Sequence, residues 1–122
     1  MQHPNFFILY VDHPPASAAF YAALLGREAV EVSPTFALFP LDSGVMLGLW
    51  SKHTVEPAAA VGGGGAEVAF SVADRDAVTA LHRDWSGRGL AMLQAPLQMD
   101  FGYTFVALDP DGHRLRVFAA GA

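Results

Sequence analysis

Short apolar runs alternate with turns and two helical stretches, and this pattern occurs twice along the chain. The first copy opens with FILYVDHPPASAAFYAALLGRE and the second with VAFSVADRDAVTALHRDWSGRG. In each copy an apolar run ends near a valine, and a helical stretch and a glycine follow. The copies also end alike, because LDSGVMLGLW matches LDPDGHRLRVF. An internal repeat of this kind predicts two copies of one supersecondary unit.

Each copy contains one helix with recognisable ends. Pro14 and Pro15 stop the first strand and open a helix over residues 16–25, where apolar residues recur at helical spacing and Gly26 provides the stop. The second helix is expected over residues 74–86, with Asp74 as its N-cap.

The remaining apolar runs predict four strands in each copy. Asp42-Ser43-Gly44 and Asp109-Pro110-Asp111-Gly112 have the composition of tight turns. Four successive glycines at 62–65 lose too much backbone entropy to hold a regular element, so residues 57–65 are expected to be a linker. The strands are expected at residues 6–11, 29–32, 35–40, 45–50, 67–72, 92–97, 103–108 and 114–118.

These elements predict an α+β fold, a single domain over residues 1–122 made of two tandem βαβββ modules. Module one covers residues 5–56 and module two residues 66–119. Each four-stranded sheet has a helix on one face, and the other faces are free to enclose a cleft, either within the chain or across a dimer. Because 52% of the residues are hydrophobic, an excess for one small core, we expect a two-fold homodimer.

Composition excludes several classes of partner. The net charge is −5 and no cluster of Lys or Arg is present, so nucleic acid is a poor partner. No apolar run approaches the roughly 18 residues of a membrane span, and residues 1–5 lack the features of a signal peptide, so a cytoplasmic location is expected. The absence of cysteine rules out disulfides, thiolate metal sites and a cysteine nucleophile.

The order of the elements and two local motifs resemble the vicinal oxygen chelate superfamily, which includes glyoxalase I, extradiol dioxygenases and bleomycin-resistance proteins. The resemblance covers essentially the whole chain and implies the tandem βαβββ fold. The motifs that carry it are V-D-x-x-x-S/A-x-x-F-Y-x-x-L-L-G in the first copy (Val11, Asp12, Ala18, Phe20, Tyr21, Leu24, Leu25 and Gly26) and D-P-D-G-H in the second (Asp109 to His113).

The resemblance also implies where a metal would lie, since catalytic members hold a divalent ion with ligands on the first and last strands of each module. Here these positions are Phe6, Gly48, Glu67 and Arg116. Phe and Gly offer no donor atom, and a guanidinium repels a cation, so only Glu67 could act as a ligand. We therefore expect no metal and no other cofactor, and assign no catalytic residue.

The histidines offer no alternative metal site. They are not arranged as H-x-H, as H-E-x-x-H or in a paired Glu/His spacing, so surface or turn positions are expected for all of them. The five are His3, His13, His53, His82 and His113.

Period-two alternation separates the two faces of each sheet. The set expected to pack beneath the helices is entirely apolar, whereas the opposite set mixes aromatic, small and charged side chains, as in a ligand pocket. The helix-facing set is Phe7, Leu9, Val11, Val45, Leu47, Leu49, Val68, Phe70, Val72, Leu115 and Val117. The cleft-facing set is Phe6, Ile8, Tyr10, Met46, Gly48, Trp50, Glu67, Ala69, Ser71, Arg114, Arg116 and Phe118.

Trp50 stands out in the cleft-facing set as a stacking surface for a flat aromatic ligand, although a Trp can equally fill a core or interface. Gly48 beside it is expected to leave room for that ligand. Weaker candidates for the pocket walls are Phe36, Phe39, Phe101 and Tyr103. Glu67 and Arg116, both on central strands of the second module, are expected to form an ion pair.

Within the superfamily the chain looks most like the phenazine-antibiotic resistance branch, metal-free proteins that sequester drugs as dimers. The matching segments are LGLWSKHTVEP and DFGYTFVALDPDGHRLRVF. This resemblance implies that Trp50 lies against a planar ligand. The expected function is therefore sequestration of a planar aromatic small molecule, with ligand-binding residues Trp50, Phe6, Tyr10, Gly48, Glu67, Arg116, Phe118 and Phe101.

Two alternatives remain open at this point. One is a glyoxalase-like lyase or isomerase, or a dioxygenase, which metal content would reveal. The other is catalysis without metal, in which Glu67 would act as a base and Tyr10 or Arg116 as an electrophilic helper. The sequence does not decide whether the protein is an enzyme, and the residues at the metal positions disfavour it.

Overall fold

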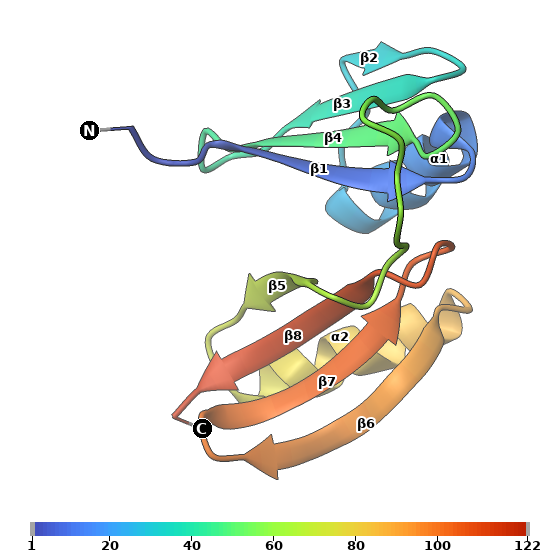
Figure 1. Cartoon of the computed structure of the whole chain (residues 1–122). Helices are drawn as coiled ribbons and strands as arrows, with labels where there is room; N and C mark the ends of the chain where they lie inside the picture. The colour runs from blue at the N-terminus through green and yellow to red at the C-terminus, as the bar shows by residue number, and fades with distance from the viewer. Residues whose placement is uncertain (1, 122) are drawn as a thin grey trace. The chain divides into compact units, whose positions relative to one another are not determined.

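The computed structural model describes residues 2–121, which form two compact units, one up to Gly62 and the other from Gly63 onward (Figure 1). Each unit contains one four-stranded sheet and one helix. This is the expected α+β arrangement of tandem βαβββ modules, and the prediction of the fold class is confirmed.

The first unit contains the N-terminal sheet, with strand order β1-β4-β3-β2. Strand β1 (Phe6–Val11) is at the edge and runs parallel to β4 (Met46–Ser51), while β3 (Phe36–Pro40) and β2 (Glu31–Val32) continue the sheet in antiparallel fashion. Helix α1 (Pro14–Leu25) packs against β3 and β4.

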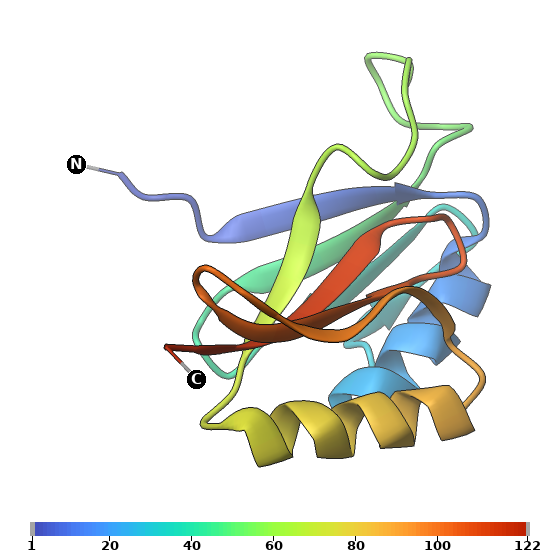
Figure 2. The same ribbon diagram turned by 90° about the horizontal axis from the view of Figure 1, so that it is seen from below.

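The second unit repeats this topology in the C-terminal sheet, with strand order β5-β8-β7-β6. The parallel pair is β5 (Glu67–Ser71) and β8 (Arg114–Ala120), and β7 (Gly102–Leu108) and β6 (Ala91–Met99) follow in antiparallel fashion. Helix α2 (Arg75–Gly87) packs against β6, β7 and β8 and lies along one side of these strands in Figure 2.

The helix ends follow from the residues that cap them. His13 Nδ1 accepts a hydrogen bond from the backbone N–H of Ala16 at 3.1 Å, and α1 therefore starts at Pro14, two residues before the expected start. Gly26 ends the helix in the left-handed conformation, with φ of 69°. At α2 the carboxylate of Asp74 accepts from Ala77 N–H at 2.8 Å, as its N-cap assignment requires.

The helix-facing side chains make the core of each unit. In the first unit Val11, Tyr21, Phe39 and Leu49 are fully buried. In the second unit the rings of Phe70 and Phe105 each meet Trp85 edge to face, with centroids 5.4 Å apart. In the same unit Val78 of α2 and Leu115 and Val117 of β8 are fully buried.

Phe7 departs from the expected core. Its alternation places it on the helix-facing side of β1, but 54% of its surface is exposed. The reason lies in the topology, since β1 is an edge strand and α1 packs against β3 and β4.

Strand β6 also differs from expectation, because it extends to Met99. Its pairing with β7 is irregular on both sides of Gln94, and on one of these sides Pro96 supplies no N–H to the ladder.

Gly102 is the glycine on which the second sheet depends most. Its φ is +151°, and an added Cβ would overlap the carbonyl group of Ala119, with Ala120 Cα only 3.0 Å away.

We expect Gly102→Ala to lower the free energy of unfolding by about 2–4 kcal/mol, because the backbone strain of a side chain at this φ adds to the cost of the steric overlap. Chemical denaturation would measure this. Gly65→Ala, where a Cβ meets nothing within 4 Å, is the matched control; an equal loss in both variants would contradict the prediction.

Candidate ligand-binding site

The face of the N-terminal sheet that points away from α1 is largely apolar and is called here the open face. Register places Tyr10 of β1 beside Trp50 of β4, and Phe36 of β3 on the other side of Trp50. In the same way Ile8 lies beside Gly48. The open face consists of Phe6, Ile8, Tyr10, Phe36, Leu38, Met46, Gly48 and Trp50.

A hollow of about 410 Å³ lies on this face, lined by Phe6, Ile8, Phe36 and Trp50. The rings of Phe36 and Trp50 meet edge to face, with centroids 6.3 Å apart and planes at 85°. Such T-shaped pairs are a favourable geometry for aromatic rings and hold both rings in place. The hollow is therefore apolar and contains the tryptophan that the sequence indicates as the stacking residue.

Gly48 shapes this hollow in a different way from that expected. The space above it is already occupied, because a Cβ there would lie 3.0 Å from Phe36 Cζ and 3.1 Å from Phe6 Cε1. The expectation of open room over Gly48 is wrong. Instead, the missing side chain lets two aromatic rings settle onto the strand, and these rings form walls of the hollow.

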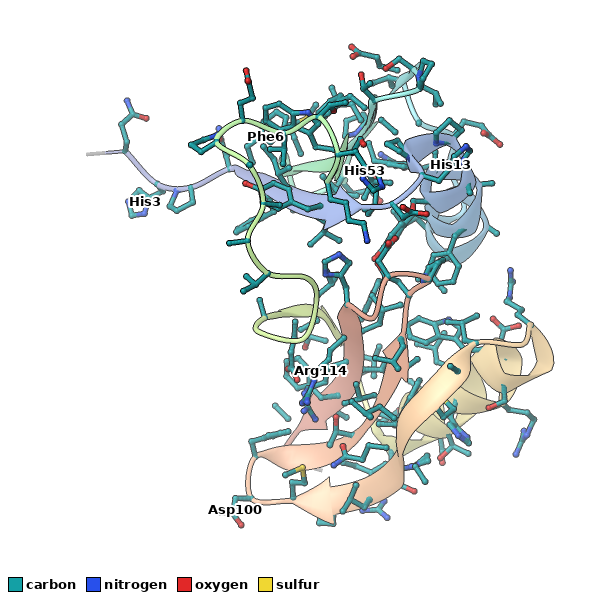
Figure 3. All side chains as sticks on the ribbon, turned by 45° about the vertical axis from the view of Figure 1, so that its right-hand side comes forward. His3, Phe6, His13, His53, Asp100 and Arg114 are labelled. Atoms are coloured by element: carbon teal, nitrogen blue, oxygen red, sulfur yellow. The ribbon has the colours of Figure 1, made fainter. Side chains whose placement is uncertain are left out.

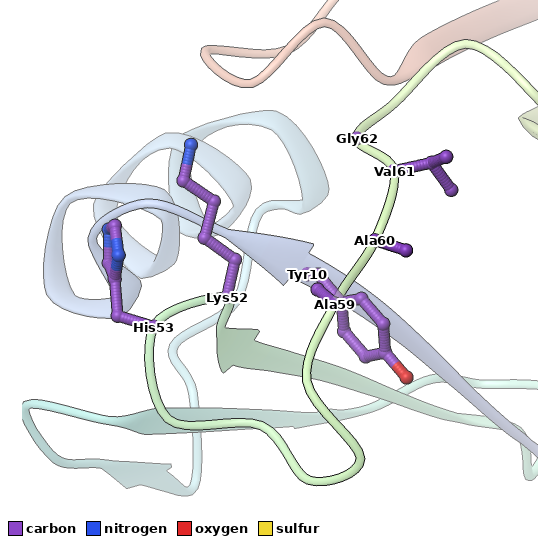
Figure 4. Close-up of a pocket in the computed structure, with 7 residues that line it drawn as sticks. All are labelled: Tyr10, Lys52, His53, Ala59, Ala60, Val61 and Gly62. Atoms are coloured by element: carbon purple, nitrogen blue, oxygen red, sulfur yellow. The ribbon is translucent and has the colours of Figure 1, made fainter.

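A second pocket, of about 320 Å³, lies where β1 and β4 end (Figure 4). Tyr10 lines it from β1, Lys52 and His53 line it from the loop after β4, and residues Ala59 to Gly62 form a strap along its other side. Because Tyr10 is also the cross-strand neighbour of Trp50, this polar pocket adjoins the aromatic part of the open face.

An acid–base pair stands beside the polar pocket. His53 Nε2 lies 2.7 Å from a carboxylate oxygen of Asp12, and this hydrogen bond is the main cause that lowers the pKa of the Asp12 carboxyl. The positive charge of Lys52 acts in the same direction. The pair fixes the loop after β4 to the end of β1.

On the C-terminal sheet Glu67 and Arg116 form the expected ion pair, which the structure confirms. Arg116 donates from Nε at 2.7 Å and from Nη2 at 2.9 Å to the two carboxylate oxygens of Glu67. Its Nη1 donates to Thr104 Oγ1 at 3.1 Å and to Gln94 Oε1 at 3.5 Å. The side chains are 17% and 31% exposed for Arg116 and Glu67, so the pair is partly shielded.

These contacts engage every nitrogen of the Arg116 guanidinium. A ligand carboxylate at this residue would compete with Glu67, and Arg116, one of the expected ligand-binding residues, is therefore a poor anion receptor. Phe101 and Phe118 lie around it: their centroids are 6.0 Å apart, and Arg116 Cζ is 5.6 Å from the Phe101 ring.

The residues at the implied metal positions do not fit a divalent ion. Phe6 and Gly48 supply no donor, and the carboxylate of Glu67 is bound to a guanidinium. Among residues 2–121 no three His, Asp or Glu side chains are grouped as a metal would require. In Figure 3 His3 lies on the N-terminal segment, apart from His13 at the start of α1 and His53 in its loop.

The structure thus gathers the sequence-predicted residues into two groups, one on each sheet. Phe6 and Trp50 line the aromatic hollow, Gly48 lies under the rings of its walls, and Tyr10 lines the neighbouring polar pocket, whereas Glu67, Phe101, Arg116 and Phe118 belong to the second unit. Sequence reasoning missed Lys52 and His53. A signal was present, because continuing the alternation 48, 50, 52 past the end of β4 brings Lys52 to the side of Trp50.

The Glu67–Arg116 pair makes stability depend on pH. The hydrogen bonds from Arg116 are the main cause that lowers the pKa of Glu67 below its ordinary value of 4.5. A lowered carboxyl pKa stabilises the fold above that ordinary value, and this stabilisation disappears as pH falls through the folded-state pKa. We expect Glu67→Gln to lower the free energy of unfolding by roughly 1–2 kcal/mol at neutral pH, and by less in acid.

Denaturation of both proteins over a pH series would measure this difference. Glu28→Gln, an exposed glutamate with no resolved pKa shift, is the control. A difference for Glu67→Gln that stays constant through the acid range would contradict the prediction.

No helix in the described part of the chain has the length and apolar character needed to cross a membrane.

The chain is 59% identical to protein ATC0852 of Agrobacterium tumefaciens over the full length of both chains, and the solution NMR structure of that protein matches this one with a TM-score of 0.92. It is 29% identical over 117 residues to the phenazine antibiotic resistance protein EhpR of Enterobacter agglomerans, covering 93% of this chain and 89% of that protein.

A glyoxalase-related enzyme from Fulvimarina pelagi shares the fold, with a TM-score of 0.83 at 22% identity over 98% of this chain and 88% of the other. At that identity the likeness concerns the fold alone. A family model matches residues 3–117, and the chain therefore belongs to the Glyoxalase/Bleomycin resistance protein/Dioxygenase superfamily.

Proposed function

We propose that this protein is a metal-free binding protein of the antibiotic-resistance type, which sequesters a planar aromatic small molecule by stacking on Trp50. The observation that carries the proposal is the hollow lined by Phe6, Ile8, Phe36 and Trp50. A shallow, almost entirely apolar hollow with three aromatic walls suits a flat ring system and offers no group for acid–base chemistry.

The similarity to a phenazine antibiotic resistance protein supports the same function, since the ligand class in that protein's name is a planar aromatic. The rings of Phe6 and Phe36 pack over Gly48, so the walls of the hollow are ordered before a ligand binds. Walls that are already ordered lower the entropic cost of binding.

The glyoxalase-like alternative has less support. Of the four implied metal positions only Glu67 could act as a ligand, and it is engaged by Arg116. Metal-free catalysis with Glu67 as the base meets a related difficulty, because the pKa of Glu67 is lowered and a lowered pKa makes a carboxylate a weaker base.

A homodimer is part of the proposal. Strand β1 is an edge strand in the N-terminal sheet, and it exposes large apolar side chains on both of its faces. The exposed fractions are 44% for Phe6, 54% for Phe7, 42% for Ile8 and 38% for Tyr10. An exposed apolar edge favours association with another protein surface, and we propose a second copy of the chain as the partner.

Replacing Trp50 tests the stacking. We expect Trp50→Ala to weaken binding of phenazines by at least about tenfold, because one ring pair and its buried area are lost, and about 1.4 kcal/mol corresponds to a factor of ten. Trp50→Phe should retain part of the affinity. Isothermal titration calorimetry with phenazine and mitomycin-type quinones would measure both variants.

Val30→Ala, an exposed apolar truncation outside the open face, is the control and should bind as the wild type does. Circular dichroism would establish that each variant is folded. Unchanged affinity in Trp50→Ala, or no saturable binding by the wild type, would contradict the proposal. Turnover of a glyoxalase-type substrate that is lost in Glu67→Gln would favour the enzyme instead.

The dimer has its own test. We expect sedimentation velocity at micromolar concentration to give twice the mass of one chain, and Phe7→Ser to shift the equilibrium towards the monomer because it removes apolar area from the edge strand. Val30→Ser, similarly exposed but away from β1, is the matched control. A wild-type protein that sediments as one chain would refute the dimer and leave the binding proposal intact.

A further inference from the structure

The polar pocket at the end of the open face has no role in the stacking described above. It is built from Tyr10, Lys52 and His53 with the strap 59–62, and it follows directly after the aromatic hollow along β1 and β4 (Figure 4). Its lining combines a phenol, an ammonium and an imidazole, so it can contact a polar group. A ligand that lies on Trp50 and extends past Tyr10 would place a substituent here.

Lys52 is the distinctive group in this pocket. It is the single lysine of the whole sequence. In the described part of the first unit the other basic residue of the Lys/Arg type is Arg27, and that guanidinium is bound to Asp42 and to the carbonyl of Pro40. The ammonium of Lys52 has no hydrogen bond or ion pair there, and Asp12, whose carboxyl pKa is lowered by the charge of Lys52, is hydrogen-bonded to His53.

One basic residue of the predicted binding set lies in the second unit, and its guanidinium is already paired. Arg116 is engaged by Glu67, Thr104 and Gln94. Within the first unit, Lys52 is thus the charged group that can meet an anion at the open face, in a chain whose net charge of −5 otherwise disfavours one.

We propose that the ligand is an aromatic carboxylate, whose ring lies on Trp50 and whose carboxylate enters the polar pocket and pairs with Lys52. This inference rests on the proposed function and adds the charge of the ligand and the residue that recognises it. Tyr10 connects the two regions, since it lines the polar pocket and is the cross-strand neighbour of Trp50.

Two probes with the same ring system separate the contribution of the ion pair with Lys52 from that of stacking on Trp50. Phenazine-1-carboxylate carries the anion, and phenazine-1-carboxamide is its neutral counterpart. We expect the wild type to prefer the carboxylate by about threefold to tenfold, as for an ion pair that is partly open to solvent. Lys52→Gln should remove this preference and leave affinity for the carboxamide unchanged. Calorimetry at fixed ionic strength would measure all four affinities.

Arg83→Gln, an exposed charge on α2 with the same change in net charge, is the matched control and should retain the preference. Arg114→Gln tests a competing cation, since Arg114 acts on Glu67 but forms no hydrogen bond or ion pair in the described residues. Preference lost in Arg114→Gln and kept in Lys52→Gln would overturn the assignment to Lys52.

Because Lys52 is the single lysine, its reactivity gives a second measurement that needs no variant. Acylation by an amine-reactive ester, followed by peptide mass spectrometry, should slow at Lys52 when phenazine-1-carboxylate is bound and should not slow with the carboxamide. Equal wild-type affinity for the two probes would refute this inference and leave stacking on Trp50 standing. Binding of neither probe would refute both.

Discussion

Parallel pairing between the first and last strands of each unit is the constraint on which the site depends. In the first unit it brings Tyr10 beside Trp50 and Ile8 beside Gly48, although some forty residues separate them in the sequence. In the second it brings β5 beside β8, so that Glu67 reaches Arg116. In each unit a helix in the connection between the parallel strands covers one face of the sheet. The other face is left uncovered by that helix and carries the side chains of the candidate site.

The two units use equivalent positions in opposite ways. In the first unit the positions implied for metal ligands are Phe6 and Gly48, and the rings of Phe6 and Phe36 fill the space over Gly48. In the second unit they are Glu67 and Arg116, which neutralise one another through two hydrogen bonds. One sheet therefore presents an apolar hollow and the other a polar network. Neither arrangement resembles the several oxygen or nitrogen donors that a divalent ion requires.

The sequence was sufficient for the fold because its signals are local and repeated. Asp74, Gly26 and the DPDG turn each specify an element end through their own backbone chemistry, and strict alternation assigned Leu49 and Val117 to the core. Sequence reasoning failed where the packing of neighbouring elements decides whether a side chain is buried. Phe7 has core alternation but lies on an edge strand away from the helix, and only the sheet order reveals this.

The site was predictable to a similar extent and for similar reasons. Trp50 and the Glu67–Arg116 pair follow from alternation on known strands. The rings above Gly48 do not, because the rotamers of Phe6 and Phe36 are set by packing across three strands. Lys52 lies one residue beyond the end of β4, where the alternation still indicates its side, but alternation does not show that the strap 59–62 makes Lys52 and His53 part of a pocket.

The two tryptophans offer the most direct measurement. Trp50 lies on the open face and Trp85 of α2 is buried against the rings of Phe70 and Phe105, so their indole N–H signals report on two separate places. In a titration with phenazine-1-carboxylate followed by two-dimensional NMR, the Trp50 signal should shift saturably while that of Trp85 stays in place. A Trp50 signal that does not move, or a saturable shift confined to Trp85, would contradict stacking on Trp50.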